Sequence, residues 1–204
     1  MKTVTISLLA TFLVAALTIS FSPGVATLAL AQNQPSQTKT APTQAAEALP
    51  GTPAQVVALD ECDPTTFNAV LGPSFCHNVA LAVLGYATTL PDLFAKAAAG
   101  TPDPGWDFEP DVLTIKKGTP VIAVDQGGEP HTFTEVATFG GGFVTGLNNG
   151  EDVVPECQGG FANVAVAKTR ILQGSQLQVT GLSKGKHYFQ CCLHPWMRVE
   201  VDVK

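Results

Sequence analysis

Hydrophobic and polar residues alternate most regularly at the C-terminal end of the chain. Within residues 198–204, valines occupy positions 199, 201 and 203, and acidic residues stand between them. A period of two places alternate side chains on one side of an extended chain, so this pattern predicts a β-strand with one buried side and one solvated side. Similar apolar stretches predict further strands at residues 112–116, 120–124, 131–136, 176–180 and 186–191.

The spacing of these strands predicts the fold class. Residues 117–119 (Lys-Gly-Thr) have the composition of a turn, so 120–124 is expected to be the return strand after 112–116. The glycine-rich residues 139–150 predict a long loop. Short strands separated in this way are typical of a mainly β protein, here an antiparallel Greek-key β-sandwich or barrel of about seven or eight strands over residues 108–204.

A helical pattern precedes the predicted strands. Asp63 followed by Pro64 is typical of a helix N-cap and first turn. Residues 91–99 predict a second helix, which Gly100 ends and which Thr89 or Leu90 precedes. We therefore expect residues 54–107 to form a small N-terminal helical appendage to the β domain.

The first 31 residues have the organisation of a secretory signal. Lys2 gives a short positive region, residues 6–17 are mostly apolar, and residues 29–31 (Ala-Leu-Ala) form a cleavage site. The alternative is an uncleaved anchor, but polar residues and Pro23 interrupt the apolar stretch before the roughly 20 residues that a membrane span needs. Residues 32–53 lack aromatic residues and predict a disordered linker. We expect export to the periplasm or the extracellular space, with no stable membrane span after cleavage.

The composition limits the classes of function that the protein can have. The chain has 204 residues, 45% of them hydrophobic and 14% charged, which is enough apolar material for a globular core. Its 11 basic and 17 acidic residues give a formal charge of −6, which argues against a nucleic-acid partner. An exported protein meets an oxidising compartment, so paired cysteines are expected to form disulfides.

The most informative motif lies between the last two predicted strands. Residues 188–198 contain Cys191, His194 and Met197, each separated from the next by two residues. Thiolate, imidazole and thioether form a soft ligand set, and two histidines, a cysteine and a weak axial methionine are the signature of a blue-copper electron-transfer site. The second histidine must come from elsewhere in the chain, and His131 is the natural candidate.

With these residues the chain resembles the cupredoxin family of plastocyanin, amicyanin and azurin-like proteins. The resemblance covers residues 108–204 and is carried by 113–119, 130–132 and 188–198, with a loop spacing similar to that of amicyanin. It implies a cupredoxin-like fold and one type 1 copper ion per chain. By resemblance, the copper ligands are His131, Cys191, His194 and Met197.

Two adjacent cysteines compete for the ligand position. Choosing Cys192 would leave a single residue before His194, a tighter chelate than the loops of the family use. Strand alternation places Cys191 on the same side as Phe189 and directs Cys192 the other way. We therefore assign Cys191 to the metal and leave Cys192 for a disulfide.

The other four cysteines allow three disulfide connectivities. We favour Cys62–Cys76 within the appendage and Cys157–Cys192 beside the metal loop, a choice that the sequence alone leaves open. His187, on the same side of its strand as Cys191, is expected to be a packed core histidine.

Other chemistries fit the sequence less well. Zinc also binds cysteine and histidine, but structural zinc sites rarely use a thioether, and paired C-x2-C knuckles are absent. Haem attachment requires a C-x-x-C-H motif, which is also absent. A trinuclear copper oxidase would need His-x-His pairs, and a copper polysaccharide monooxygenase would need an N-terminal histidine where cleavage exposes Gln32. We expect no enzymatic activity.

The function expected from this ligand set is that of an exported one-electron carrier. In the family, the histidine of the cysteine loop faces solvent in an apolar patch, so a protein redox partner is expected to dock near His194, Pro195 and Trp196. The protein is expected to be a monomer. The alternative is an extracytoplasmic copper-handling protein that stores or delivers the metal without transferring electrons.

Overall fold

The computed structural model describes residues 46–47, 52–77 and 85–204, which belong to one compact unit, Thr40–Lys204. The expected signal at 1–31 and most of the expected linker at 32–53 lie outside the described residues. Within that linker, Ala46–Glu47 form the short strand β1. Among the described residues, no helix combines the length and the apolar character that crossing a membrane requires.

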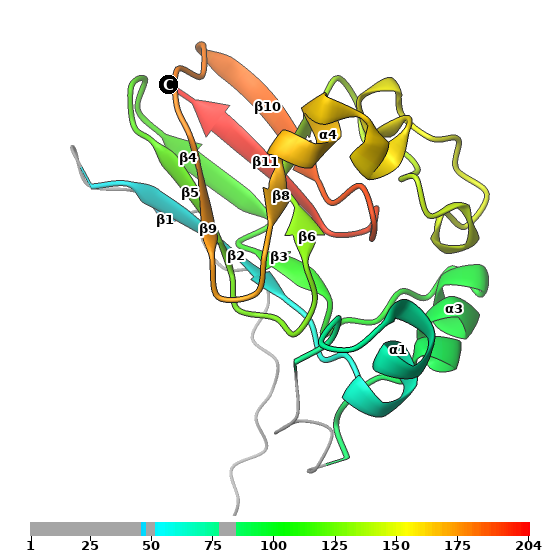
Figure 1. Ribbon diagram of the computed structural model, residues 1–204. Helices are drawn as coiled ribbons and strands as arrows, with labels where there is room; N and C mark the ends of the chain where they lie inside the picture. Colours follow the sequence, from blue (N-terminus) through cyan, green and yellow to red (C-terminus); the bar gives the residue numbers. More distant parts are fainter. Residues whose placement is uncertain (1–45, 48–51, 78–84) are drawn as a thin grey trace, which may run out of the picture. The chain divides into compact units, whose positions relative to one another are not determined.

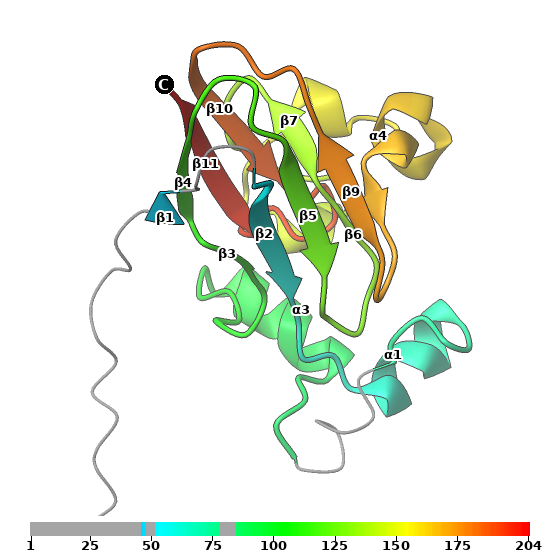
Figure 2. The same ribbon diagram turned by 90° about the vertical axis from the view of Figure 1, so that its left-hand side faces the viewer.

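The strands form two main sheets and a small third one (Figures 1 and 2). The first sheet has the order β1, β4 (Val112–Ile115), β11 (Arg198–Val203), β10 (Gly185–Gln190) and β7 (Thr134–Val136). The second has the order β3 (Asp107–Glu109), β2 (Ala54–Leu59), β5 (Val121–Asp125) and β9 (Gln176–Val179). The third pairs β6 (His131–Thr132) with β8 (Arg170–Ile171).

The predicted mainly β fold with a small helical part is confirmed, and both main sheets are mixed rather than purely antiparallel. Strand β4 runs parallel to β11, and β2 runs parallel to β5, whereas β10 and β11 are antiparallel. The expected return strand was misplaced: β4 and β5 lie in different sheets. The turn at 117–119 therefore carries the chain from one sheet to the other. No closed barrel is formed by the described strands.

The predicted helices are present as α1 (Pro64–Leu71) and α3 (Leu90–Ala98). The Asp63 carboxylate caps α1 by accepting from the backbone N–H groups of Thr65 and Thr66. Thr89 is the N-cap of α3, which decides between the two residues that the sequence left open. The glycine-rich connection and the residues after it contribute η1 (Thr145–Leu147), η2 (Pro155–Cys157), η3 (Gly160–Ala162) and α4 (Val164–Lys168).

The segment 54–107 is not helical throughout, contrary to its description as an appendage. It begins with β2, which pairs with β5 from Ala54 to Ala58 and buries Val56 completely. It ends at β3, which pairs with the other edge of β2. Helices α1 and α3 are therefore inserted between two strands of the second sheet. The segment belongs to the β domain, since alternate side chains of β2 are buried in the core.

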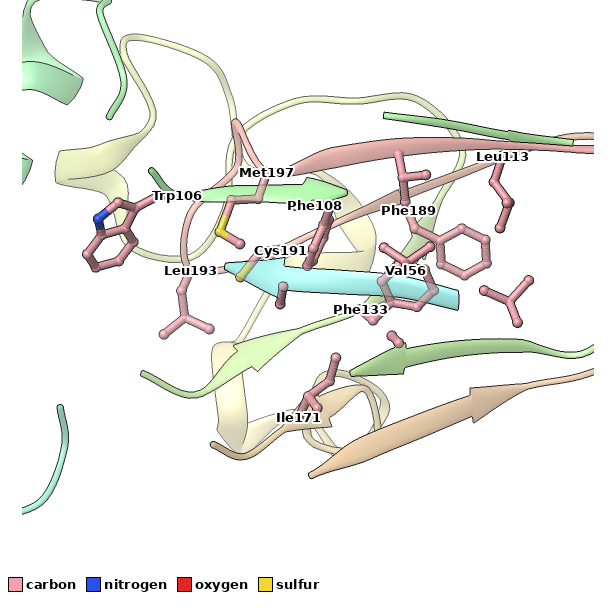
Figure 3. Packing of buried hydrophobic residues seen from close by; sticks show 14 of the residues in the cluster. Val56, Trp106, Phe108, Leu113, Phe133, Ile171, Phe189, Cys191, Leu193 and Met197 are labelled. Atoms are coloured by element: carbon pink, nitrogen blue, oxygen red, sulfur yellow. The ribbon is translucent and has the colours of Figure 1, made fainter. Parts of the chain in front are cut away.

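Aromatic side chains fill the core between the sheets (Figure 3). The rings of Phe133 and Phe189 stack at a centroid distance of 4.4 Å, and Phe108 meets Phe133 edge to face at 5.5 Å. Such pairs add about 0.5–1.5 kcal/mol each to the stabilisation from burial. Strand β10, which carries Phe189, is thus packed against this aromatic cluster.

The two favoured disulfides, Cys62–Cys76 and Cys157–Cys192, are both present. The second lies in a smaller buried cluster on the far side of β10, with Val136, Val154 and Val166. Cys191 is the free cysteine and is wholly buried. The assignment of Cys192 to a disulfide is therefore confirmed, and the assignment of Cys191 to the metal stays a prediction.

Candidate metal centre

The loop between β10 and β11 folds back on itself and gathers its side chains. The Cys191 N–H donates to the Met197 carbonyl at 3.1 Å, and the Met197 N–H donates to the His194 carbonyl at 2.9 Å. Gln190 and Arg198 then pair at the base of the loop as β10 meets β11. This closure brings the three candidate ligands of the loop to one end of the core.

His131 reaches the same point from the start of β6, where it pairs with Ile171 of β8. The Cys191 Sγ lies 3.8 Å from His131 Nδ1 and 3.9 Å from His194 Nδ1. The Thr132 N–H donates to the same sulfur at 3.4 Å. Each of the two imidazoles and the thiol can offer one donor atom such that all three atoms lie within 4.8 Å of one another.

Met197, the fourth candidate ligand, is fully buried in the main core. Figure 3 shows its sulfur next to that of Cys191, on the side of the core where Trp106 lies. The structure therefore brings the donor atoms of His131, Cys191 and His194 together, and the Met197 carbonyl accepts a hydrogen bond from the Cys191 backbone beside them. Their role as ligands stays a prediction.

Burial and mutual hydrogen bonding shift the pKa values of these groups. Burial by itself would raise the pKa of the Cys191 thiol, but hydrogen bonds and charge from His131 and His194 hold it well below its usual value. Burial would lower the pKa of His131, yet its contacts with Asp60 and Cys191 raise it above the usual value. The pKa of His194 is lowered, chiefly by burial. The site thus favours a thiolate in contact with imidazole.

Two buried carboxylates that sequence reasoning missed contact the far nitrogens of the imidazoles. Asp60 Oδ2 lies 2.9 Å from His131 Nε2, and Glu129 Oε2 lies 3.4 Å from His194 Nε2. Burial raises the pKa of Glu129 to about 9, with a further contribution from the charge of Asp60. Glu129 stands two residues before His131 in the sequence, but Asp60 is 71 positions away from it, and no local motif marks it.

A third carboxylate, that of Asp125, belongs to the same buried region. With Asp60 and His131 it forms a second group that could hold a cation. Its Oδ1 accepts the Gly127 N–H at 2.9 Å, and burial raises its pKa to about 7. Asp125 therefore adds a buried acid whose carboxylate lies within 4.8 Å of a ring nitrogen of His131.

The expectation that the histidine of the loop faces solvent was wrong, because His194 is only 3% exposed. The Trp106 ring meets it edge to face at a centroid distance of 4.7 Å, and Trp196 lies at 5.6 Å. The Trp196 Nε1–H donates to the Trp106 carbonyl at 3.1 Å, which joins the two tryptophans. Pro195 is also buried, so Trp196, which is partly exposed, is the part of the expected docking patch that reaches the surface.

His187 also differs from expectation. It is partly buried rather than packed in the core. Its Nδ1 lies 2.6 Å from Glu135 Oε1, and its Nε2 lies 2.9 Å from the Ser183 carbonyl. The hydrogen bond with Glu135 raises the pKa of His187. This histidine belongs to a surface ion pair.

The spacing of the three donors fits a metal ion. Bonds of about 2.0–2.3 Å from a metal to imidazole and thiolate place the donor atoms just under 4 Å apart, close to the two sulfur–nitrogen distances observed here. Soft thiolate and thioether donors favour copper, whereas hard cations prefer oxygen. A catalytic cysteine nucleophile is a poorer interpretation, since a substrate would have to reach a sulfur that is fully buried.

Comparison with known proteins gives likeness of structure only. No family model matches the chain, and no curated protein matches it. Solved structures that resemble it include a purple cupredoxin from Nitrosopumilus maritimus, at 14% identity and a TM-score of 0.37, with 74% of this chain and 99% of that chain covered. A reduced amicyanin variant is 20% identical, with a TM-score of 0.31, over 48% of this chain and 73% of the other.

A copper-containing nitrite reductase from Thermus scotoductus is also similar, at 20% identity and a TM-score of 0.32. The match covers 49% of this chain but 20% of that enzyme. At such identities the chemistry of the site has to be inferred from its own side chains.

Proposed function

We propose that this protein binds one copper ion through His131, Cys191, His194 and Met197 and carries single electrons between redox partners. The observation that supports this function best is the convergence of two imidazole Nδ1 atoms on the buried Cys191 sulfur, at 3.8 and 3.9 Å. When bound in such a set, copper supplies a reversible one-electron couple between Cu(II) and Cu(I).

The chain's own residues would hold the donors in place and keep water away. Cys191 and Met197 are fully buried and His194 nearly so, within a loop closed by backbone hydrogen bonds. A packed scaffold of this kind resists movement of its side chains. Little rearrangement should therefore accompany a change in metal charge, which is what an electron carrier requires. The same enclosure leaves a substrate little access, which favours a carrier over an enzyme.

Copper storage or delivery is a second candidate, because enclosure of the site also favours it. Buried donors release a metal slowly, and slow release suits a protein that retains copper. A carrier must in addition be oxidised and reduced quickly by a partner. The kinetics of electron exchange therefore separate the two functions.

A protein partner is proposed to approach near His194, Pro195 and Trp196, with Trp196 as the point of contact. A cavity of about 170 Å³ beside this side chain is lined in part by Pro195, Trp196 and Arg198. The formal charge of −6 favours a basic partner. Export through the signal at residues 1–31 would place the protein in the periplasm or outside the cell, where both disulfides are stable.

Visible spectroscopy after addition of Cu(II) tests the site. The wild-type protein should show an intense thiolate-to-copper band that disappears on reduction and returns on reoxidation. Cys191→Ser should abolish the band. The matched control is the double variant Cys157→Ser/Cys192→Ser, which removes the neighbouring disulfide and should retain the band. A colourless wild-type protein that still binds metal would overturn the blue-copper assignment and favour zinc or copper storage.

Slow electron exchange in a blue protein would instead favour copper handling. Stopped-flow oxidation of the Cu(I) protein by a small soluble oxidant, followed at the thiolate-to-copper band, measures this rate.

A further inference from the structure

Asp60 is a buried carboxylate that connects the segment 54–107 to the candidate metal centre. It follows the last residue of β2, and its side chain is fully buried. Oδ1 accepts the Cys62 N–H at 3.2 Å, and Oδ2 accepts the Glu129 N–H at 2.9 Å. The same Oδ2 lies 2.9 Å from His131 Nε2, so this nitrogen must carry the proton of the hydrogen bond.

The surroundings of Asp60 leave it little freedom to move. Cys62 is bridged to Cys76, and its backbone pairs with that of Thr88. The chain also passes so close at Gly127 that a Cβ built there would lie 1.8 Å from Asp60 Oδ2. A side chain other than hydrogen at Gly127 would therefore displace the carboxylate. Backbone N–H groups and close packing thus hold Asp60 against His131.

The contact determines which nitrogen of His131 is free. When a bound metal replaces the proton on Nδ1, the proton on Nε2 stays with Asp60, and Nδ1 is the atom that lies 3.8 Å from the Cys191 sulfur. Carboxylates that contact the far nitrogen of a metal-binding histidine fix its tautomer and orientation and raise its basicity. A buried negative charge also favours the more highly charged state of a nearby metal ion.

We propose that Asp60 is a positioning residue of the copper site, which orients His131 and favours Cu(II) over Cu(I). This inference rests on the proposed function. It also assigns to the segment before residue 108 a part in the metal centre, where resemblance placed the whole site within 108–204.

The other buried acids are less suited to this role. Asp125 contacts the backbone of Gly127 rather than the imidazole ring. Glu129 lies against His194, at the longer distance of 3.4 Å. Among the described acids, Asp60 therefore has the short contact with a ligand histidine.

The test compares Asp60→Asn with Asp103→Asn in the full chain. Asp103 is a matched control because it is a buried acid of the same segment whose side chain is held by Lys96 at 2.5 Å, by Thr88 and by the Gly105 N–H rather than by a candidate ligand. Affinities for Cu(II) and Cu(I), from competition with chelators, give the ratio of the two for each variant. The midpoint potential reports the same ratio independently.

Asp60→Asn should weaken Cu(II) binding by about 10–100-fold, the usual effect of losing such a partner. Cu(I) binding should weaken less, so the midpoint potential should rise. Asp103→Asn should lower the unfolding temperature and leave the ratio of affinities unchanged. Equal losses of Cu(II) and Cu(I) affinity in Asp60→Asn would show a merely structural role and overturn the inference.

A second measurement keeps the inference falsifiable if Asp60→Asn does not fold. Nitrogen-15 NMR of the wild-type protein with Zn(II), which is diamagnetic, identifies the protonated nitrogen of His131. A proton on Nε2 supports the role of Asp60, and a proton on Nδ1 overturns it. A wild-type protein without the thiolate-to-copper band would overturn the proposed function itself, whereas a normal band with an unchanged ratio in Asp60→Asn would overturn this inference alone.

Discussion

The loop at 191–197 and the segment at 54–107 both contribute to the candidate metal centre, but in different ways. The loop carries three donors within seven residues, and backbone hydrogen bonds between its own ends close it. The segment carries no predicted ligand, yet it brings Asp60 to His131 and Trp106 to His194. The loop thus supplies three of the four candidate donors, and the segment contacts the histidines at this site. Candidate ligands that lie within a short motif can be recognised from the sequence. The residues that contact these ligands are dispersed along the chain and cannot be recognised in the same way.

The largest expected effect comes from removing the cover. Trp106→Ala should lower the free energy of unfolding by about 3–5 kcal/mol, because it leaves a cavity against Phe67 and His194. Loss of bound copper to a chelator should also become faster. Tyr86→Ala is the control within the same segment, since Tyr86 is 67% exposed. Chemical denaturation measures stability, and equal metal release in both variants would contradict a covering role for Trp106.

The disulfides allow the two regions to be compared directly. Cys157–Cys192 spans 35 positions and Cys62–Cys76 spans 14, so chain entropy predicts losses of about 4 and about 3 kcal/mol on replacement by serine pairs. Urea unfolding gives both values. The Cys62→Ser/Cys76→Ser variant should also alter the copper midpoint potential, because Cys62 holds Asp60. An unchanged potential would mean that the bridge stabilises the segment without supporting the site.

A smaller change tests the chemistry of the loop. Met197→Leu nearly conserves volume, so it should cost less than about 1.5 kcal/mol in unfolding free energy. The thiolate-to-copper band should remain, since Cys191 is unchanged. The midpoint potential should rise, because Cu(II) loses a donor. A midpoint potential equal to that of the wild type would show that Met197 is a core residue and not a copper ligand.

The smallest expected effect lies outside both regions, at the surface pair of His187 and Glu135. A histidine whose pKa is raised in the folded state contributes stability below its unfolded pKa of about 6.5 and loses it as the pH rises through the folded value. His187→Gln should therefore be destabilised by less than about 1 kcal/mol between about pH 5 and 6.5. The difference from wild type should vanish at alkaline pH. Unfolding measured across this pH series checks the sign, and a difference that grows with pH would contradict the ion pair.

Features that depend on neighbouring residues were predicted more reliably than the pairing of distant strands. The alternation of residues 198–204, the Asp63 cap and the turn composition at 117–119 each depend on neighbours in the chain, and each of these features is present. The partner of a strand depends on residues far away in sequence. That is why β4 and β5 were expected to pair but lie in different sheets. It is also why β2 was overlooked within a segment expected to be helical.

The sequence by itself determined that Cys191, His194 and Met197 lie within one short loop and that the adjacent Cys191 and Cys192 point to opposite sides of a strand, because spacing and strand alternation constrain where neighbouring side chains can point. The resemblance to cupredoxins added His131, and the disulfide pairing stayed a choice among three connectivities. Only the tertiary structure decided that His131 reaches Cys191, that Asp60 contacts His131, and that Trp106 covers His194. These contacts join residues tens of positions apart. They exist because the packing of β2, β5 and β6 against the core brings distant segments together, and no local pattern encodes that packing.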